Sequence, residues 1–275
     1  MKPKTAVLMA AASSAPKVIL IILGILLAII LIIAAVIAVF ASKNTKAMNK
    51  ALDEAVGVIS KQYEVTEKPA GEYETMKIYG ILKFHTKQYS VKNLGNLSVM
   101  KVNMGFMQMA TLILTPTEQN LPLVSADYMY MFGNRKSYLE FFDLVAEKDE
   151  PYQALLKKLQ AVKDSYKQYP DIVREASWMD ELETVGIYKS GKAADDTTFN
   201  TMLKEGLQTV LDAAKELPLL EEPARSGKQK CNKEYTDGLI SKGGISTDIF
   251  KKSLGDAVTR DFFDKVLFGS ATVNR

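Results

Sequence analysis

The stretch Leu121-Pro-Leu-Val-Ser-Ala-Asp127-Tyr-Met-Tyr-Met-Phe132 has the pattern of a strand with two largely apolar faces. Such a strand lies in the middle of a sheet that is covered on both sides. Asp127 interrupts the pattern, on a face that it shares with Ser125 and Met129. An ionised carboxylate in that position would be poorly solvated without a partner. The stretch therefore predicts a central strand with one acidic group on a covered face.

The residues that follow predict a tight hairpin. Gly133-Asn134 is a two-residue turn of the type that supplies positive φ, and Lys136–Val145 reads as the next strand. If this turn sets the register, Asp127 lies directly opposite Glu140. Like charges that face each other on a sheet are unfavourable, and one carboxyl then keeps its proton with a raised pKa.

A protonated acid in an apolar site is what a proton-donating catalyst needs near neutral pH. We therefore predict Asp127 and Glu140 as the catalytic pair. Two alternatives remain open. A bulge could shift the register, or either acid could be bonded to Lys, Tyr or backbone groups in a purely structural role.

Periodicity on either side of this hairpin predicts the fold class. From Thr75 to Ala146 apolar residues recur with period two, which predicts about five antiparallel strands. Beyond Pro151 the period returns to 3.6, which predicts helices. Strands in the middle and helices before and after them indicate an α+β fold, an α/β/α sandwich with a central antiparallel sheet flanked by helices. The expected helices are Lys46–Lys61, Tyr152–Tyr169, Thr198–Leu217, Lys228–Ser241 and Ser246–Phe268.

One uncharged segment predicts the domain organisation. Val18–Ala41 would form a helix of about 36 Å, against a hydrocarbon core of roughly 30 Å. We interpret it as a transmembrane helix between a short tail (1–17) and a linker helix (42–70), with one domain over 71–275. A buried core helix and a cleavable signal peptide are the alternatives. Orientation is undecided, because three lysines stand on each side, Lys2, Lys4 and Lys17 before and Lys43, Lys46 and Lys50 after.

Composition excludes several kinds of site. A single cysteine, Cys231, excludes a disulfide framework and multi-thiolate metal sites, and a single histidine, His85, excludes a two-histidine metal centre. We expect no metal. The net charge of +3 is too small to indicate a nucleic-acid partner.

The predicted sheet contains a basic section. No acidic residue lies between Glu74 and Glu118. The section could seat an anionic ligand or lipid headgroups, or its lysines could form a solvated face or protect edge strands. Its basic residues are Lys77, Lys83, His85, Lys87, Lys92 and Lys101.

Two segments make the chain resemble a known family. Pro122-Leu-Val-Ser-Ala-Asp127 followed by Phe142-Asp143-Leu144 resembles the pattern around the catalytic strand of the ferredoxin-dependent bilin reductases and their plant relative, red chlorophyll catabolite reductase. Near the end of the chain, Phe250-Lys-Lys-Ser-Leu254-Gly255 and Phe262-Phe-Asp-Lys-Val-Leu-Phe268 resemble the last helices of that family. The likeness runs in order from Lys77 to Phe268.

The resemblance implies a linear tetrapyrrole, as substrate or ligand, between the sheet and the C-terminal helices. It implies no permanently bound cofactor, electrons from a ferredoxin-type donor and protons from the protein. Asp127 matches the family's catalytic aspartate, with Glu140 as its tuning partner. Lys101 or Arg135 would pair with substrate propionates. The candidate substrate-binding residues are Lys101, Arg135, Ser125 and Asn103.

Three hypotheses follow. The first is a membrane-anchored, bilin-reductase-like oxidoreductase whose C-terminal domain lies in the cytoplasm, where ferredoxin is found. The second is a non-catalytic protein that binds a tetrapyrrole or another amphipathic anion, because bilin reductases commonly add a Glu and a His on preceding strands and neither type occurs between Val91 and Thr117. The third is a membrane-tethered structural or interaction protein.

Overall fold

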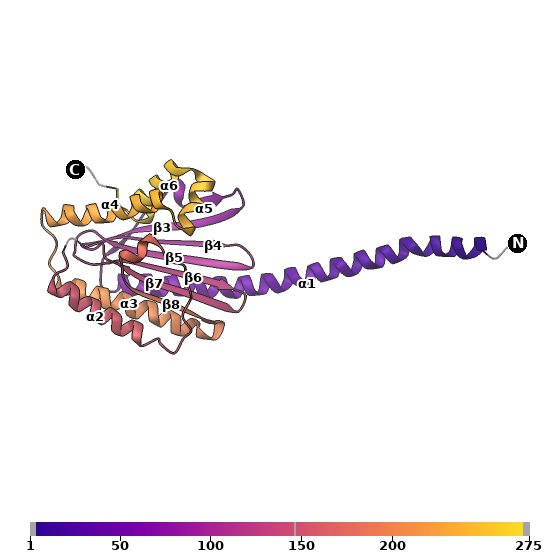
Figure 1. The fold of residues 1–275 in the computed structure, drawn as a ribbon, viewed down its shortest axis with the longest axis horizontal. Coiled ribbons are helices and arrows are strands. Elements are labelled where there is room, and N and C mark those ends of the chain that lie inside the picture. The colour runs from indigo at the N-terminus through magenta and orange to yellow at the C-terminus, as the bar shows by residue number, and fades with distance from the viewer. Residues whose placement is uncertain (1–3, 146, 272–275) are drawn as a thin grey trace.

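The computed structural model describes residues 4–145 and 147–271, and its centre is one antiparallel sheet of eight strands (Figure 1). The strand order is β1-β3-β4-β5-β6-β7-β8, and β2 also pairs with β3. Five successive hairpin-linked strands, β3 to β7, form the meander that the period-two pattern predicts. The strands are β1 (Val65–Lys68), β2 (Thr75–Ile78), β3 (Leu82–Val91), β4 (Gly95–Asn103), β5 (Met107–Pro116), β6 (Leu123–Met131), β7 (Asn134–Phe142) and β8 (Glu183–Lys192).

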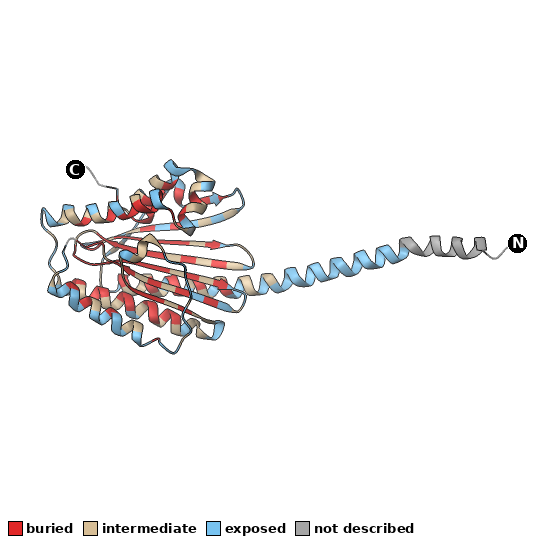
Figure 2. Ribbon diagram, viewed as in Figure 1, coloured by how far each residue is buried: buried red, intermediate tan, exposed pale blue. Residues whose placement is uncertain are grey.

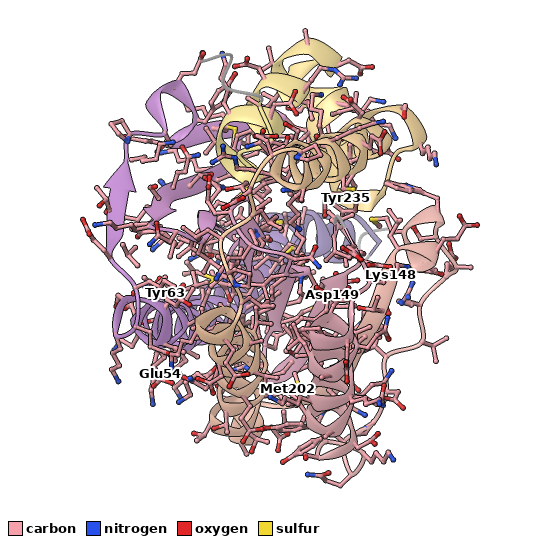
Figure 3. All side chains as sticks on the ribbon, turned by 90° about the vertical axis from the view of Figure 1, so that its left-hand side faces the viewer. Glu54, Tyr63, Lys148, Asp149, Met202 and Tyr235 are labelled. Atoms are coloured by element: carbon pink, nitrogen blue, oxygen red, sulfur yellow. The ribbon has the colours of Figure 1, made fainter. Side chains whose placement is uncertain are left out.

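Helices cover both faces of the sheet. Viewed end-on, one layer of helices lies above the strands and another below (Figure 3). The first layer packs on the apolar side chains of one face and consists of α1 (Lys4–Ser60), α2 (Glu150–Asp164) and α3 (Asp196–Glu216). The second packs on the other face and consists of α4 (Ala224–Lys242), α5 (Ile245–Leu254), α6 (Asp256–Phe262) and a π-helical turn, Phe263–Leu267.

Strand β8 is the main element that the periodicity did not predict. It follows α2 through an irregular segment and pairs with β7, beyond the predicted meander. The stretch Thr75–Ala146 also holds six strands rather than about five, because the short β2 precedes β3. Strand β8 adds a further row of side chains to the sheet beside β7, and two of them reach the candidate site.

Helix α1 has two parts with different surroundings. Residues 17–36 project alone from the domain and are exposed (Figure 2). Its inner part packs in the core, where Met48, Leu52, Ala55 and Ile59 are at most 6% exposed. The expected linker helix, 42–70, is helical only as far as Ser60, and this helical part packs in the core of the domain rather than forming a separate linker. Residues 1–3 of the expected tail lie outside the described residues, and from Lys4 the chain is already helical.

Candidate functional site

The register of β6 and β7 differs from the predicted one. Asp127 pairs with Tyr138, and Glu140 pairs with Ser125. The two-residue turn is Phe132-Gly133, with Phe132 at a φ of 51°. Asp127 and Glu140 are therefore not directly opposite, and that prediction was wrong by two residues. A two-residue shift preserves the alternation of faces, so both carboxyls still lie on the α4–α6 side of the sheet.

Asp127 is half-buried in a row of side chains that crosses four strands. Its neighbours in the row are Thr111 on β5, Tyr138 on β7 and Tyr188 on β8. The Thr111 hydroxyl donates a hydrogen bond to Oδ1 of Asp127. Burial raises the pKa of Asp127, and the Thr111 bond opposes this shift only in part. No cation is among the causes of the shift, so the carboxyl is biased toward its protonated form.

Glu140 lies in the adjacent row and is also half-buried. Burial, and then the charge of Asp127, raises the pKa of Glu140 to about 8. The Tyr188 hydroxyl, 3.0 Å from Oε1 of Glu140, opposes this rise. A carboxyl with this pKa carries its proton at neutral pH and can donate it.

A third acid completes the cluster. Glu183 accepts a hydrogen bond from Nη2 of Arg174 at 3.0 Å, and the two side chains form an ion pair. The Tyr188 hydroxyl contacts Glu183 as well as Glu140. One hydroxyl proton can serve only one carboxylate, so both contacts are satisfied when Tyr188 donates to Glu183 and protonated Glu140 donates to the Tyr188 oxygen. A protonated Glu140 is thus compatible with both contacts of the Tyr188 hydroxyl.

Gly186 makes room for this arrangement. A Cβ at Gly186 would lie 2.2 Å from Oε1 of Glu183 and 2.5 Å from the ring of Tyr188. The missing side chain is what allows Tyr188 to reach across β8 toward Glu140. The guanidinium of Arg174 packs on the outer face of the Tyr188 ring, 4.6 Å from its centroid.

Helix α4 brings Tyr235 close to the acids. Tyr235 lies between α4 and the sheet (Figure 3), where its ring contacts Phe142 of β7 at a centroid distance of 5.2 Å. Trp178 and Phe268 pack against the same ring. Burial raises the pKa of the Tyr235 phenol, and the charges of Glu140 and Asp127 raise it further. Tyr235 therefore remains a neutral group that encloses the cluster in an apolar layer.

Beyond Asp127 the same face becomes apolar and more open. The next row pairs Met109 with Met129, and Met129 with Lys136. Both methionines are half-buried, and Lys136 is exposed. A methionine surface with one cation beside it suits an amphipathic anion, because thioether side chains adapt to flat apolar groups.

The structure does not bring three of the predicted substrate-binding residues to Asp127. Lys101 and Asn103 lie on the opposite face and contact α1, where Lys101 donates to Asn49 at 3.0 Å. Arg135 also lies on that face and is buried in a two-bond ion pair with Asp196 of α3. Their grouping with Asp127 was wrong, because alternate residues of a strand point to opposite faces. Ser125, which is 8% exposed, shares the face of Asp127.

A separate cavity of about 630 Å³ lies on the α1 face of the sheet. Residues of α1, β3 and β4 line it, among them His85, Lys87 and Lys101. Part of its charge is already neutralised, since Lys87 pairs with Glu67 at 3.1 Å. The imidazole of His85 lies 3.1 Å from the Thr75 hydroxyl and is on this face, across the sheet from Asp127.

The sequence reasoning missed Tyr188, Glu183 and Arg174. The run Thr184-Val-Gly-Ile-Tyr188 alternates in period two and is rich in β-branched residues, so a strand signal was present. Arg174 lies in an irregular segment, and no local pattern marks it. Within the described residues, no group of three or more His, Cys, Asp or Glu side chains could hold a metal ion.

Comparison with known proteins identifies the type of fold. No protein-family model matches the sequence, and no curated protein matches it. The fold is of the ferredoxin-dependent bilin reductase type, as the sequence resemblance predicted. One solved structure with this fold is phytochromobilin synthase from tomato in complex with biliverdin, with a TM-score of 0.67 and 14% sequence identity. The alignment covers 81% of this chain and 83% of that one.

Proposed function

We propose that this chain is a membrane-anchored oxidoreductase that reduces a linear tetrapyrrole with electrons from a ferredoxin-type donor. The observation that carries the proposal is the half-buried pair Asp127 and Glu140 on the face that the C-terminal helices cover, where burial raises the pKa of both carboxyls and that of Glu140 reaches about 8. The fold supports it, because tomato phytochromobilin synthase has the same fold and was solved with biliverdin.

The role of the protein in this chemistry is to supply protons. Each electron that enters a conjugated tetrapyrrole adds negative charge, and a proton must follow for a carbon–hydrogen bond to form. Asp127 would donate to the bound molecule, and Glu140 would restore the proton on Asp127. Tyr188 would hold the Glu140 carboxyl in place through its hydroxyl. The reducing equivalents come from the external donor, so no residue of the chain is oxidised.

Contacts with the tetrapyrrole would come from the same face. Met109 and Met129 offer apolar surface to the pyrrole rings, and Ser125 offers a hydroxyl beside the acids. Lys136 is the exposed cation in the next row, and we assign it to a propionate in place of Lys101 and Arg135. This assignment keeps every contact on one side of the sheet.

Membrane anchoring is part of the proposal. Among the described residues, one helix is long and apolar enough to cross a bilayer, and its apolar segment is not buried. Exposed apolar surface of this extent requires lipid or protein to cover it. A ferredoxin-type donor would place the domain on the cytoplasmic side, which a reporter fused after Arg275 tests.

The experiment uses the full-length chain in nanodiscs. Biliverdin is titrated in and the visible absorption spectrum is recorded, and then reduced ferredoxin is added without oxygen. We expect a shifted spectrum on binding and its further change on turnover. Asp127→Asn should bind biliverdin and lose turnover by roughly 10²-fold or more. Asp212→Asn, at an exposed carboxylate on α3, is the matched control. Normal turnover by Asp127→Asn would refute the proton-donor role.

A non-catalytic tetrapyrrole-binding protein is the second candidate function. It is favoured because His85 lies on the face opposite Asp127, and no acidic residue lies between Glu74 and Glu118 to add another proton donor. The same titration separates the two. A spectral shift with biliverdin and no change with reduced ferredoxin would establish the binding role, and no shift at all would leave a structural protein.

A further inference from the structure

Three turns at one end of the strands carry exposed apolar side chains. They join β2 to β3 (79–81), β4 to β5 (104–106) and β6 to β7 (132–133). Outside α1, eight large hydrophobic side chains are exposed among the described residues, and five of them lie on these turns or directly beside them. The five are Tyr79 (53%), Ile81 (79%), Phe106 (47%), Met131 (38%) and Phe132 (36%). We call this set the turn edge.

The turns at the opposite end of the strands differ in composition. They are polar or charged, and the one large apolar residue of the β3–β4 turn, Leu94, is buried. Exposed aromatic and aliphatic side chains are thus concentrated at one end of the domain. This asymmetry is not needed for packing, since these side chains are exposed and the core of both faces is complete without them.

Helix α1 leaves the domain at the turn edge (Figure 1). The rings of Phe40 and Phe132 meet at right angles, with centroids 5.7 Å apart. Gly105 lies beside Ile37, and the Asn103 side chain donates to Thr45 at 3.2 Å. Two of the three turns, β4–β5 and β6–β7, therefore meet α1 near the last residues of its apolar segment.

The length of the apolar segment sets the depth of this contact. Its 24 residues give about 36 Å of helix, about 6 Å more than the hydrocarbon core. If the segment spans the bilayer, its last turn, which includes Phe40, lies at the headgroup level. Phe132, in contact with Phe40, is then at the same depth, where aromatic side chains are favoured.

Lysines surround the turn edge. Lys77 and Lys83 are exposed and directly opposite each other across β2 and β3, and neither forms an ion pair with a described residue. Like charges in this position destabilise a sheet unless an anion neutralises them. Exposed lysines also lie on α1 just beyond the apolar segment and at the end of β8, namely Lys43, Lys46 and Lys192.

We infer that the turn edge is a membrane-docking surface, whose apolar turns insert at the headgroup level of an anionic leaflet and whose lysines bind lipid phosphate or carboxylate groups. The inference rests on the proposed membrane anchoring and goes beyond it, because the domain would lie on the bilayer rather than hang from a flexible tether. Docking would hold the sheet axis at a fixed angle to the membrane. The continuous helix from α1 into the core supports such a rigid arrangement.

The test measures the depth of single fluorescent labels. Full-length protein carrying Cys231→Ser is labelled with bimane at Ile81→Cys or Phe106→Cys, and is placed singly in nanodiscs containing phosphatidylserine and nitroxide-labelled lipids. We expect the lipids to quench bimane at both positions. A label at Lys92→Cys, in a turn at the opposite end of the strands, is the matched control, and its bimane fluorescence should not be quenched.

Two further measurements separate the possible failures. A label at Leu31→Cys reports on the apolar segment itself. Quenching at residue 31 without quenching at 81 and 106 would overturn docking and leave the anchor intact, whereas no quenching at residue 31 would overturn both. The double change Lys77→Glu with Lys83→Glu should reduce quenching at Ile81→Cys severalfold. Unchanged quenching in that variant, or equal quenching in nanodiscs of phosphatidylcholine alone, would overturn the anionic-lipid role.

Discussion

Asp127 and Glu140 lie on one face of the sheet in neighbouring strands and adjacent rows, because Asp127 pairs with Tyr138 and Glu140 pairs with Ser125. This diagonal arrangement keeps the two carboxyls within electrostatic reach of each other without direct contact in register. It raises the pKa of Glu140 and leaves Asp127 free to hydrogen-bond with Thr111. The two acids therefore have different partners and can have different roles.

The coupling between the acids is measurable. Replacing Asp127 by Asn removes the charge that raises the pKa of Glu140, so this pKa should fall from about 8 toward its ordinary value. Infrared difference spectra of the carboxyl band across a pH titration would follow it. Asp212→Asn should leave the titration unchanged. A Glu140 titration that does not move in Asp127→Asn would show that the two acids are not coupled.

Stability should fall with rising pH because of Glu140. The folded protein holds this pKa at about 8 against an ordinary value of 4.5, so between these values the folded state binds more protons than the unfolded state. The free energy of unfolding therefore decreases as pH rises through this window. Chemical denaturation of Glu140→Gln should show a flatter profile over pH 4.5 to 8. An unchanged slope would refute the raised pKa.

Lys228 should give the opposite slope at higher pH. Its side chain is completely buried and donates to the carbonyl oxygens of Leu121 and Leu144. Burial lowers its pKa from 10.5 to about 7, so the unfolded state binds more protons between these values and stability rises with pH.

The variant Lys228→Met tests this second slope. It should abolish the rise and, at high pH, should cost about 1–3 kcal/mol through the unsatisfied carbonyls. Lys230→Met, at an exposed position of the same helix, serves as the control and should keep the wild-type profile. Equal profiles for the two variants would contradict the prediction.

Gly186→Ala should disturb the site through sterics alone. The added methyl would overlap Glu183 and Tyr188, so we expect a loss of about 1–3 kcal/mol of stability and displacement of Tyr188 from Glu140. Gly57→Ala, where an added Cβ meets nothing within 4 Å and lies inside α1, should be neutral or stabilising by up to about 1 kcal/mol. Thermal unfolding of both variants gives the comparison, and equal effects would argue against the close packing at Gly186.

The elements whose apolar residues repeat with a local period could be predicted from the chain alone. The two-sided apolar pattern around Asp127 predicted a central strand, and the stripe from Lys46 to Lys61 predicted the inner part of α1, because the period of apolar residues reflects which side chains can share one covered face. The apolar segment Val18–Ala41 is equally local, since its length and lack of charge are read directly from the chain.

How these elements meet depends on contacts between distant parts of the chain, which local patterns do not encode. A two-residue shift of register leaves the period-two pattern unchanged, so sequence could place Asp127 and Glu140 on one face and still pair them wrongly. Lys101 and Arg135 were grouped with Asp127 because the sequence does not say whether the odd-numbered or the even-numbered residues of each strand face the α4–α6 layer. Tyr188, Glu183 and Arg174 reach the acids only because β8 packs beside β7 after a long connection, and no local pattern encodes that contact.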